Sequence, residues 1–149
     1  FWPTINSYKR LVDGFWAPVK PTWGVDNRTA SFRVIPGSPK STRLETRCPG
    51  SDINPYLTCA ARLAAGLAGN EQKLELEPEM KGDMYSAGGV REIPHNLREA
   101  AELLNGSKLF REAFGDDVID HYHHAAQWEI SETDRVVTDF EIQRLLERA

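Results

Sequence analysis

The sequence predicts an α+β fold in which a small antiparallel sheet segment is followed by packed helices. Residues 29–34 and 43–47 alternate polar with apolar side chains, as strands with one buried face do. From Asn54 onward the apolar residues recur at helical spacing instead. This change of period divides the 149 residues into a segment of loops and one hairpin, residues 1–48, and a mostly helical segment, residues 49–149.

The first segment is expected to hold one hairpin among structured loops. Residues 1–27 are rich in proline, glycine and tryptophan, a composition that favours turns over helices. Residues 36–42 read PGSPKST, which is typical of a turn. The strands on either side of this turn should therefore pair antiparallel.

The first long helix is predicted after Asn54, which can cap it, with Pro55 in its first turn. We expect this helix to end at Gly69 or Asn70. Residues 70–94 lack a sustained period and contain several prolines and glycines, so we expect mostly loop there.

Capping signals predict further helices in the last third of the chain. Asn96 with Glu99, and Thr138 with Glu141, have the spacing of a capping box. Gly106 and Gly115 are expected to end helices. The predicted helices cover residues 97–104, residues 108–114, a longer stretch beginning at Asp116, and residues 140–146.

The composition indicates a folded domain, because hydrophobic residues make up 40% and charged residues 27%. No apolar run approaches the roughly 18 residues of a membrane span, so we expect no membrane segment. Cys48 and Cys59 lack the spacing of a metal knuckle or of a disulfide framework, and a reducing, cytoplasmic location is expected. The chain begins with Phe1 and not with Met, so we expect a part of a longer protein.

The net charge of -4 hides an asymmetry between the two segments. Residues 1–48 hold eight Lys and Arg against three Asp and Glu, whereas residues 49–149 hold ten against nineteen. A basic segment within an acidic chain indicates a local site for small phosphates or carboxylates. Nucleic-acid binding would require a wider basic surface and is not expected.

The polar face of the hairpin is the strongest candidate site. Period-two geometry puts Arg43, Glu45 and Arg47 in a row, and antiparallel pairing can bring Arg33 alongside. A carboxylate among guanidinium groups stays ionised and can bind a hard cation, while the guanidinium forks can hold phosphate or carboxylate oxygens. The alternative is an exposed, salt-bridged strand face without function.

A second group of polar residues resembles a metal site less well. Asp117, Asp120, His121, His123 and His124 lie near one face of a predicted helix. Such a face could bind a transition metal adventitiously, but a catalytic zinc site needs three protein ligands and a defined second shell. We therefore expect a solvated helix with partly packed imidazoles.

Five segments also carry a family resemblance. Residues 6–12 (NSYKRLV), 27–33 (NRTASFR), 38–40 (SPK), 43–47 (RLETR) and 54–57 (NPYL) follow one another in the order and spacing of glutamine synthetases. The chain resembles the C-terminal part of the catalytic domain of such an enzyme. The resemblance is dense over residues 5–69 and looser to the end.

The resemblance implies an ATP-dependent ligase that uses Mg²⁺ or Mn²⁺ and forms a γ-glutamyl phosphate, which a nitrogen nucleophile attacks. The implied roles fall on eight residues. Glu45 resembles a metal ligand, Arg10 and Arg47 the glutamate-binding arginines, Arg28 an arginine assisting phosphoryl transfer, and Arg33, Lys40 and Arg43 the residues around the nucleotide phosphates. Trp16 lies in residues 14–18 (GFWAP), which resemble the flap that closes the acceptor site.

The sequence departs from the family pattern in two places. Ammonia-using members carry a Glu in the flap where this chain has Trp16, and a tryptophan cannot accept the ammonium proton. Its face could instead pack on an alkyl or cationic amine, so the chain looks more similar to the γ-glutamylpolyamine and γ-glutamylputrescine synthetases of the family than to a true ammonia assimilator. The alternative is that Trp16 simply packs the flap. The region of Tyr85 resembles the loop that carries an adenylylated tyrosine but lacks the acidic and proline residues that follow there, so we do not expect that control.

Several alternatives remain open from the sequence. The acceptor could be ammonia, as in an authentic glutamine synthetase, or the chain could be a catalytically idle structural relative such as those of the lens. The resemblance also implies further metal ligands upstream of Phe1 and a homo-oligomer, expected as a double ring, with glutamate, ATP and an amine or ammonia as small-molecule partners. The isolated fragment is expected to be inactive.

Overall fold

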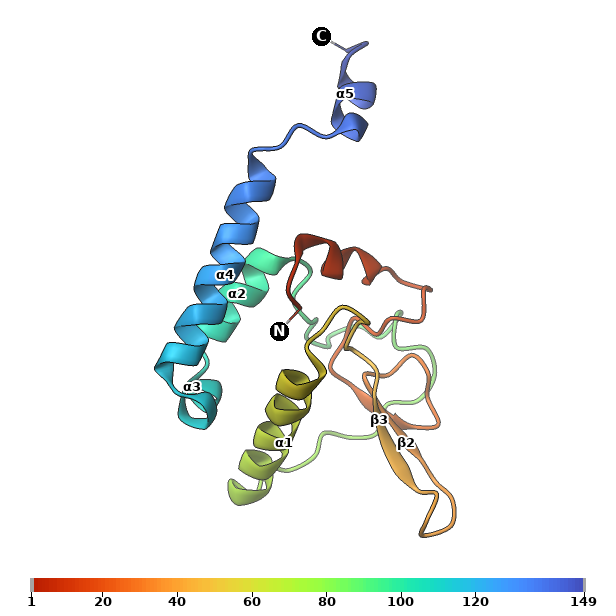
Figure 1. The fold of residues 1–149 in the computed structure, drawn as a ribbon. Coiled ribbons are helices and arrows are strands. Elements are labelled where there is room, and N and C mark those ends of the chain that lie inside the picture. Colours follow the sequence, from red (N-terminus) through yellow and green to blue (C-terminus); the bar gives the residue numbers. More distant parts are fainter. Residues whose placement is uncertain (1, 149) are drawn as a thin grey trace.

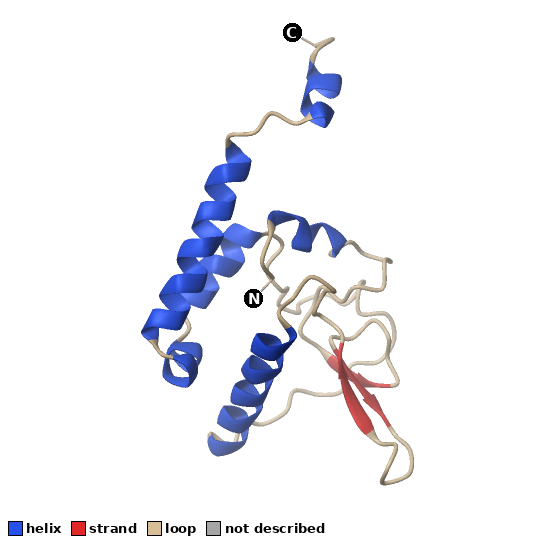
Figure 2. Ribbon diagram, viewed as in Figure 1, coloured by secondary structure: helices blue, strands red, loops and turns tan. Residues whose placement is uncertain are grey.

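The computed structural model describes residues 2–148 and has the α+β architecture that the sequence predicts (Figure 1). The elements, in chain order, are η1 (Ile5–Arg10), β1 (Trp23–Val25), β2 (Phe32–Ile35), β3 (Arg43–Thr46), α1 (Pro55–Glu71), α2 (Leu97–Asn105), α3 (Lys108–Phe114), α4 (Asp116–Asp134) and α5 (Asp139–Leu145). Figure 2 shows the strands together on one side of the molecule and the long helices on the other. The short helix α5 lies beyond the end of α4, away from the sheet (Figure 1).

The three strands form one sheet in the order β1-β2-β3. β2 and β3 pair antiparallel, which confirms the predicted hairpin, and the register sets Arg33 opposite Glu45. β1 pairs parallel to β2 and was not predicted, because its three residues lie within a segment whose prolines and glycines indicate loop. The sheet is therefore mixed, with the predicted antiparallel pair as its larger part.

The first predicted strand begins later than its alternating pattern suggested. Asn27 accepts hydrogen bonds at its Oδ1 from both the backbone nitrogen and the hydroxyl of Thr29, at 2.9 and 2.7 Å. An Asx turn of this kind competes with strand pairing. Residues 29–31 therefore belong to a turn, and β2 runs from Phe32 to Ile35.

The helix boundaries follow the predicted caps closely. The predicted caps Asn54, Asn96 and Thr138 each accept a hydrogen bond from a backbone nitrogen in the first turn of the helix that follows. Ser107, which was not predicted as a cap, does the same for α3. The end of α1 was predicted too early, because the helix continues through Gly69 and Asn70 to Glu71. α2 and α5 differ from their predicted bounds by one residue. The left-handed conformation that commonly ends a helix falls on Lys73, at φ +50°.

The core lies where η1 packs against α2 and α4. Tyr8, Leu97 and Ile130 form a buried cluster, and the ring of Trp2 meets that of Tyr8 edge to face at 5.0 Å. Burial raises the pKa of Tyr8, with the nearby Asp52 carboxylate adding to the effect. The start of η1 is thus fixed on the helices. Its end, at Arg10, lies close to the end of β3.

A contact between helix and sheet completes the arrangement. The guanidinium of Arg62 on α1 lies over the ring of Phe32 on β2, 5.1 Å from its centre. Residues 73–94 contain neither helix nor strand, as expected, and run from α1 back past β1 to α2.

The helices also bear on whether the chain could span a membrane. No helix within residues 2–148 is long and apolar enough to do so.

Ile119→Ala should lower the free energy of unfolding by about 2 to 5 kcal/mol. Ile119 is fully buried on α4, which packs against α2 and α3, so truncation leaves a cavity. The same substitution at Ile142, which is 45% exposed on α5, should cost less than about 1 kcal/mol. Urea unfolding of the two variants checks this, and equal losses would contradict the assigned core.

Candidate active site

One carboxylate at the centre of the hairpin is surrounded by three arginines. Arg33 on β2 donates from Nη1 to Oε2 of Glu45 at 3.1 Å across the strand pair. Arg47 Nη1 lies 3.5 Å from the same oxygen, and Arg43 Nη2 lies 3.9 Å from Oε1. The charged row predicted from the alternation is therefore present, and it gathers on Glu45.

Arg33 is held from its other side by Asp26, a residue that the sequence analysis missed. Arg33 donates to Oδ1 of Asp26 from Nε at 3.1 Å and also from Nη2. The hydrogen bonds to Asp26 and then to Glu45 raise the pKa of Arg33, although partial desolvation opposes them. Asp26 sits at φ +49°, in a left-handed turn that Asp tolerates, and the turn brings its carboxylate beside the hairpin. The Asp26–Arg33 pair depends on the path of this turn in three dimensions and cannot be predicted from the spacing of the two residues.

Arg47 joins the hairpin to the two loop residues that the family resemblance singled out. Its Nε donates to the carbonyl of Arg28 at 3.0 Å, and its Nη2 reaches the carbonyl of Trp16 at 3.5 Å. Trp16 adopts φ +60°, close after Gly14 at φ +82°. A positive φ is uncommon for a bulky residue and indicates a conformation imposed by its surroundings. The indole is 62% exposed, so the rest of residues 2–148 does not bury it.

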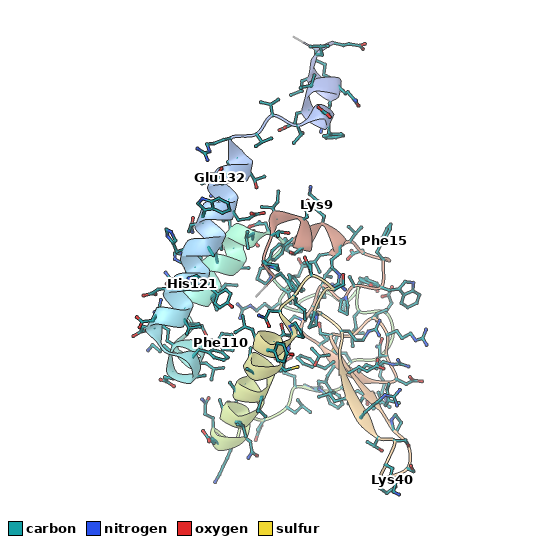
Figure 3. The ribbon with its side chains drawn as sticks, viewed as in Figure 1. Lys9, Phe15, Lys40, Phe110, His121 and Glu132 are labelled. Carbon is teal, nitrogen blue, oxygen red and sulfur yellow. The ribbon has the colours of Figure 1, made fainter. Side chains whose placement is uncertain are left out.

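Two other predicted residues lie at the edges of this arrangement. Arg10, at the end of η1, donates from Nη1 to the carbonyl of Cys48 at 2.7 Å, just beyond β3. Lys40 lies at the tip of the hairpin turn, where Figure 3 shows it at the far end of the strands. The structure therefore brings Arg10 near the root of the hairpin but does not bring Lys40 to Glu45.

An open cleft of about 640 Å³ adjoins the cluster. Trp16, Arg28 and Arg33 line it together with Asp26 and with residues 79–82 of the long loop. A second, more apolar groove of about 330 Å³, lined by residues such as Ala61, Leu104 and Phe110, lies among the helices and holds none of the predicted site residues. The polar cleft is thus lined by two of the predicted arginines, Arg28 and Arg33, and Arg33 connects it to the cluster around Glu45.

The long loop 77–87 forms one wall of the site, although its composition gave no hint of an ordered path. Trp23 Nε1 donates to the carbonyl of Glu77 at 2.7 Å, and Asn27 Nδ2 donates to that of Gly82 at 2.9 Å. Met84 donates its backbone nitrogen to Thr29 Oγ1 at 3.0 Å. These side-chain to backbone bonds order the loop without regular secondary structure.

The residues present fit one part of a divalent-metal site. Glu45 offers carboxylate oxygens, which Mg²⁺ and Mn²⁺ prefer as ligands. Within residues 2–148 no three His, Cys, Asp or Glu side chains gather closely enough to hold an ion. Glu45 can therefore supply one ligand, and a complete cation site would need oxygens from outside these residues.

The histidine-rich face of α4 has the solvated character that we expected. Asp120 pairs with Arg111 at 2.8 Å, and His123 lies 3.3 Å from Glu102. His121 and His124 are exposed, and Figure 3 shows His121 on the outer side of the helix. The partners of Asp120 and His123 thus occupy two of the five groups that the sequence analysis singled out.

Comparison with known proteins places these features in a family. The family described as "Glutamine synthetase, catalytic domain" matches residues 1–145. A type-1 glutamine synthetase of Dictyostelium discoideum is 48% identical over 151 residues, which cover 99% of this chain and 29% of that protein. A γ-glutamylethanolamide synthetase, GlnA4, of Streptomyces coelicolor is 49% identical over 146 residues, covering 98% of this chain and 31% of that protein.

A solved structure agrees in fold. The chain superimposes on a GmaS–ADP complex with a TM-score of 0.83 and 33% sequence identity, over 98% of this chain and 35% of that one. The chain thus spans about a third of the length of the proteins that it matches.

The Asp26–Arg33 pair should contribute more to stability than an ordinary surface pair. Asp26→Asn removes the carboxylate charge from Arg33, whose side chain is only 14% exposed, and should lower the urea midpoint. Asp134→Asn is the matched control, because Asp134 is similarly exposed but its partner Arg98 is exposed as well. We expect a smaller change for the control, and the difference should shrink in about 1 M NaCl. Equal urea midpoints for the two variants in low salt would contradict the larger stabilisation that we assign to the Asp26–Arg33 pair.

Proposed function

Because this chain belongs to the glutamine synthetase family, we propose that it forms part of an ATP-dependent and metal-dependent ligase that joins glutamate to a nitrogen acceptor. The observation that carries the proposal is the cluster of Arg33, Arg43 and Arg47 around Glu45. An isolated scaffold has no physical need to gather three guanidinium groups on one carboxylate beside an open cleft. This favours a ligase over an idle structural relative.

The proposed reaction has two steps. An oxygen of the glutamate γ-carboxylate attacks the γ-phosphorus of ATP, the bond to the bridging oxygen breaks, and ADP leaves. The lone pair of the acceptor nitrogen then attacks the acyl carbon of the γ-glutamyl phosphate. Inorganic phosphate leaves with the oxygen that came from glutamate, and the nitrogen loses a proton to a base.

The side chains of this chain would bind and orient the reactants. Arg33, Arg43 and, from the hairpin tip, Lys40 would contact the nucleotide phosphates, while Arg28 would neutralise charge on the phosphoryl group in transit. A bound Mg²⁺ or Mn²⁺ would supply further charge neutralisation, with Glu45 as one of its ligands.

Glutamate itself would be held by two further arginines. The forked guanidinium groups of Arg10 and Arg47 would bind its carboxylates. Their hydrogen bonds to the carbonyls of Cys48 and Arg28 support this role, because they fix the direction of both side chains before substrate binds.

We propose an amine as the preferred acceptor. The flap carries Trp16 and no carboxylate at that position, and its indole is exposed at the cleft. An alkyl chain or a distal cation could lie against this face. The similarity to a γ-glutamylethanolamide synthetase supports this choice. Ammonia is the second candidate, supported by the similarity to a type-1 glutamine synthetase.

The intact protein is proposed to be a cytoplasmic homo-oligomer, arranged as a double ring. The thiols of Cys48 and Cys59 are free, which supports a reducing compartment. Large apolar side chains that stay exposed within residues 2–148, such as Leu67, Trp128 and Phe140, are suited to contacts between segments or subunits.

Glu45→Ala in the intact enzyme should lower kcat by about a hundredfold or more, because a metal ligand is lost. The fold should stay largely intact, since the substitution leaves the apolar side of the strand unchanged. Glu75→Ala, an exposed loop substitution, is the control and should retain activity. Steady-state assays over a range of magnesium concentrations decide the matter. Wild-type turnover of Glu45→Ala at limiting magnesium would show that Glu45 is not a ligand.

The acceptor preference should depend on Trp16. Contact of a desolvated cation with an aromatic face is worth about 2 kcal/mol, or roughly thirtyfold in affinity. The intact enzyme should therefore form γ-glutamyl amides from mono- or polyamines with higher kcat/KM than it forms glutamine from ammonium. Trp16→Glu should narrow this difference, whereas Trp16→Phe should largely keep it.

Trp128→Glu serves as the matched control for Trp16→Glu, because Trp128 is a similarly exposed tryptophan on α4. It should leave the acceptor ratio unchanged. Parallel assays with ammonium, ethanolamine, isopropylamine and putrescine give the ratio directly. A wild-type enzyme that prefers ammonium to every amine would restore ordinary glutamine synthetase as the function.

A further inference from the structure

Lys20 is a buried cation with an unusual set of partners. Its side chain lies in the interior, with the residue 6% exposed. Its ammonium donates to the carbonyls of Met84, Tyr85 and Ala87, at 3.2, 2.8 and 2.7 Å. An ammonium has three N–H donors, so these three carbonyls use all of them.

Burying the Lys20 ammonium costs free energy, because the charge loses its water. Within residues 2–148, no carboxylate forms an ion pair with Lys20, so carbonyl dipoles alone replace its water. Such a group costs desolvation free energy that a methionine of similar length would avoid. In return, the hydrogen bonds of the ammonium fix the geometry of a loop that lies more than sixty positions further along the chain.

The backbone of Lys20 is fixed at the root of the hairpin. Ser31 donates its hydroxyl to the Lys20 carbonyl, and the Cys48 thiol donates to Ser31 Oγ at 3.0 Å. The preceding residue, Val19, accepts at its carbonyl from the backbone nitrogen of Ile93 at 2.9 Å. Lys20 therefore reaches the loop from a rigid base, through a side chain that has little freedom.

The loop that Lys20 holds carries Tyr85, and Tyr85 contacts the flap. The Tyr85 hydroxyl donates to the carbonyl of Ala17 at 3.4 Å, next to Trp16. Residues 17–20, which connect Trp16 to Lys20, are all buried. A tyrosine hydroxyl is protonated at neutral pH, so Tyr85 is a donor there, and burial raises its pKa further.

The geometry points to Lys20 as a positioning residue for the acceptor side of the site. Its ammonium fixes loop 84–87, the loop fixes Tyr85, and Tyr85 supports the flap from which Trp16 projects. The inference rests on the proposed ligase function for its kinetic consequence, but the fixing of the loop is independent of that function. Lys20 touches none of the proposed reactants and acts through the flap.

The test uses Lys20→Met in the intact enzyme, which keeps the length of the side chain and removes its donors. We expect the KM for the amine acceptor to rise about tenfold, with the KM values for glutamate and ATP changed less than about twofold. Hydrogen exchange at the backbone amides of residues 83–89 should accelerate by about tenfold or more. Lys108→Met, at an exposed position on α3, should change neither measurement.

A second variant keeps the test decisive if Lys20→Met folds poorly. Tyr85→Phe removes only the hydroxyl that reaches Ala17, so it should raise the amine KM while leaving the exchange of residues 83–89 close to wild type. An unchanged amine KM in either folded variant, or an unchanged exchange rate in Lys20→Met, would overturn the inference. Absence of γ-glutamyl amide formation in the wild type would instead refute the proposed function, and the exchange measurement would still test the loop.

Discussion

The cross-strand pair between Arg33 and Glu45 is the interaction on which the arrangement of the site depends. Antiparallel pairing of β2 with β3 sets the two residues opposite each other, and their side chains meet at 3.1 Å. Every other charged partner is placed relative to this pair, with Asp26 behind Arg33 and Arg47 beside Glu45. A shift of one residue in the register would send one of the two side chains to the opposite face of the sheet and separate them. The turn at residues 36–42 and the register it fixes are therefore prerequisites for the chemistry.

The sequence predicts what depends on local periodicity and capping, and it misses what depends on the tertiary path of loops. The row Arg43, Glu45 and Arg47 follows from the two-residue period, and the caps at Asn96 and Thr138 follow from side chains that bond their own helix. Asp26 could not be assigned in this way, because its partner lies seven positions away across a left-handed turn. Lys20 escaped notice for the same reason, since its three acceptors come from a loop without any periodic signal.

The apolar pattern of α1 shows a second limit of sequence analysis. Its stripe of leucines and alanines correctly predicts a helix, and Ala61 is buried. Leu63 and Leu67 nevertheless stay exposed within residues 2–148. A hydrophobic stripe indicates that a face is suited to burial, but it does not identify the surface that covers it. The chain spans about a third of the length of the relatives that it matches. Contacts from outside residues 2–148 would be needed to cover these side chains and to complete the proposed metal site.

The proposed function requires that ATP activate the γ-carboxylate of glutamate at the cluster around Glu45. Transfer of oxygen from glutamate to phosphate tests it most directly, because the first step joins a carboxylate oxygen to phosphorus and the second releases it as phosphate. Glutamate labelled with ¹⁸O in its γ-carboxylate should be supplied to the intact enzyme with ATP, magnesium and an amine, and the inorganic phosphate analysed by mass spectrometry. We expect one labelled oxygen in the phosphate for each amide formed. Amide formation without labelled phosphate would contradict the proposed function.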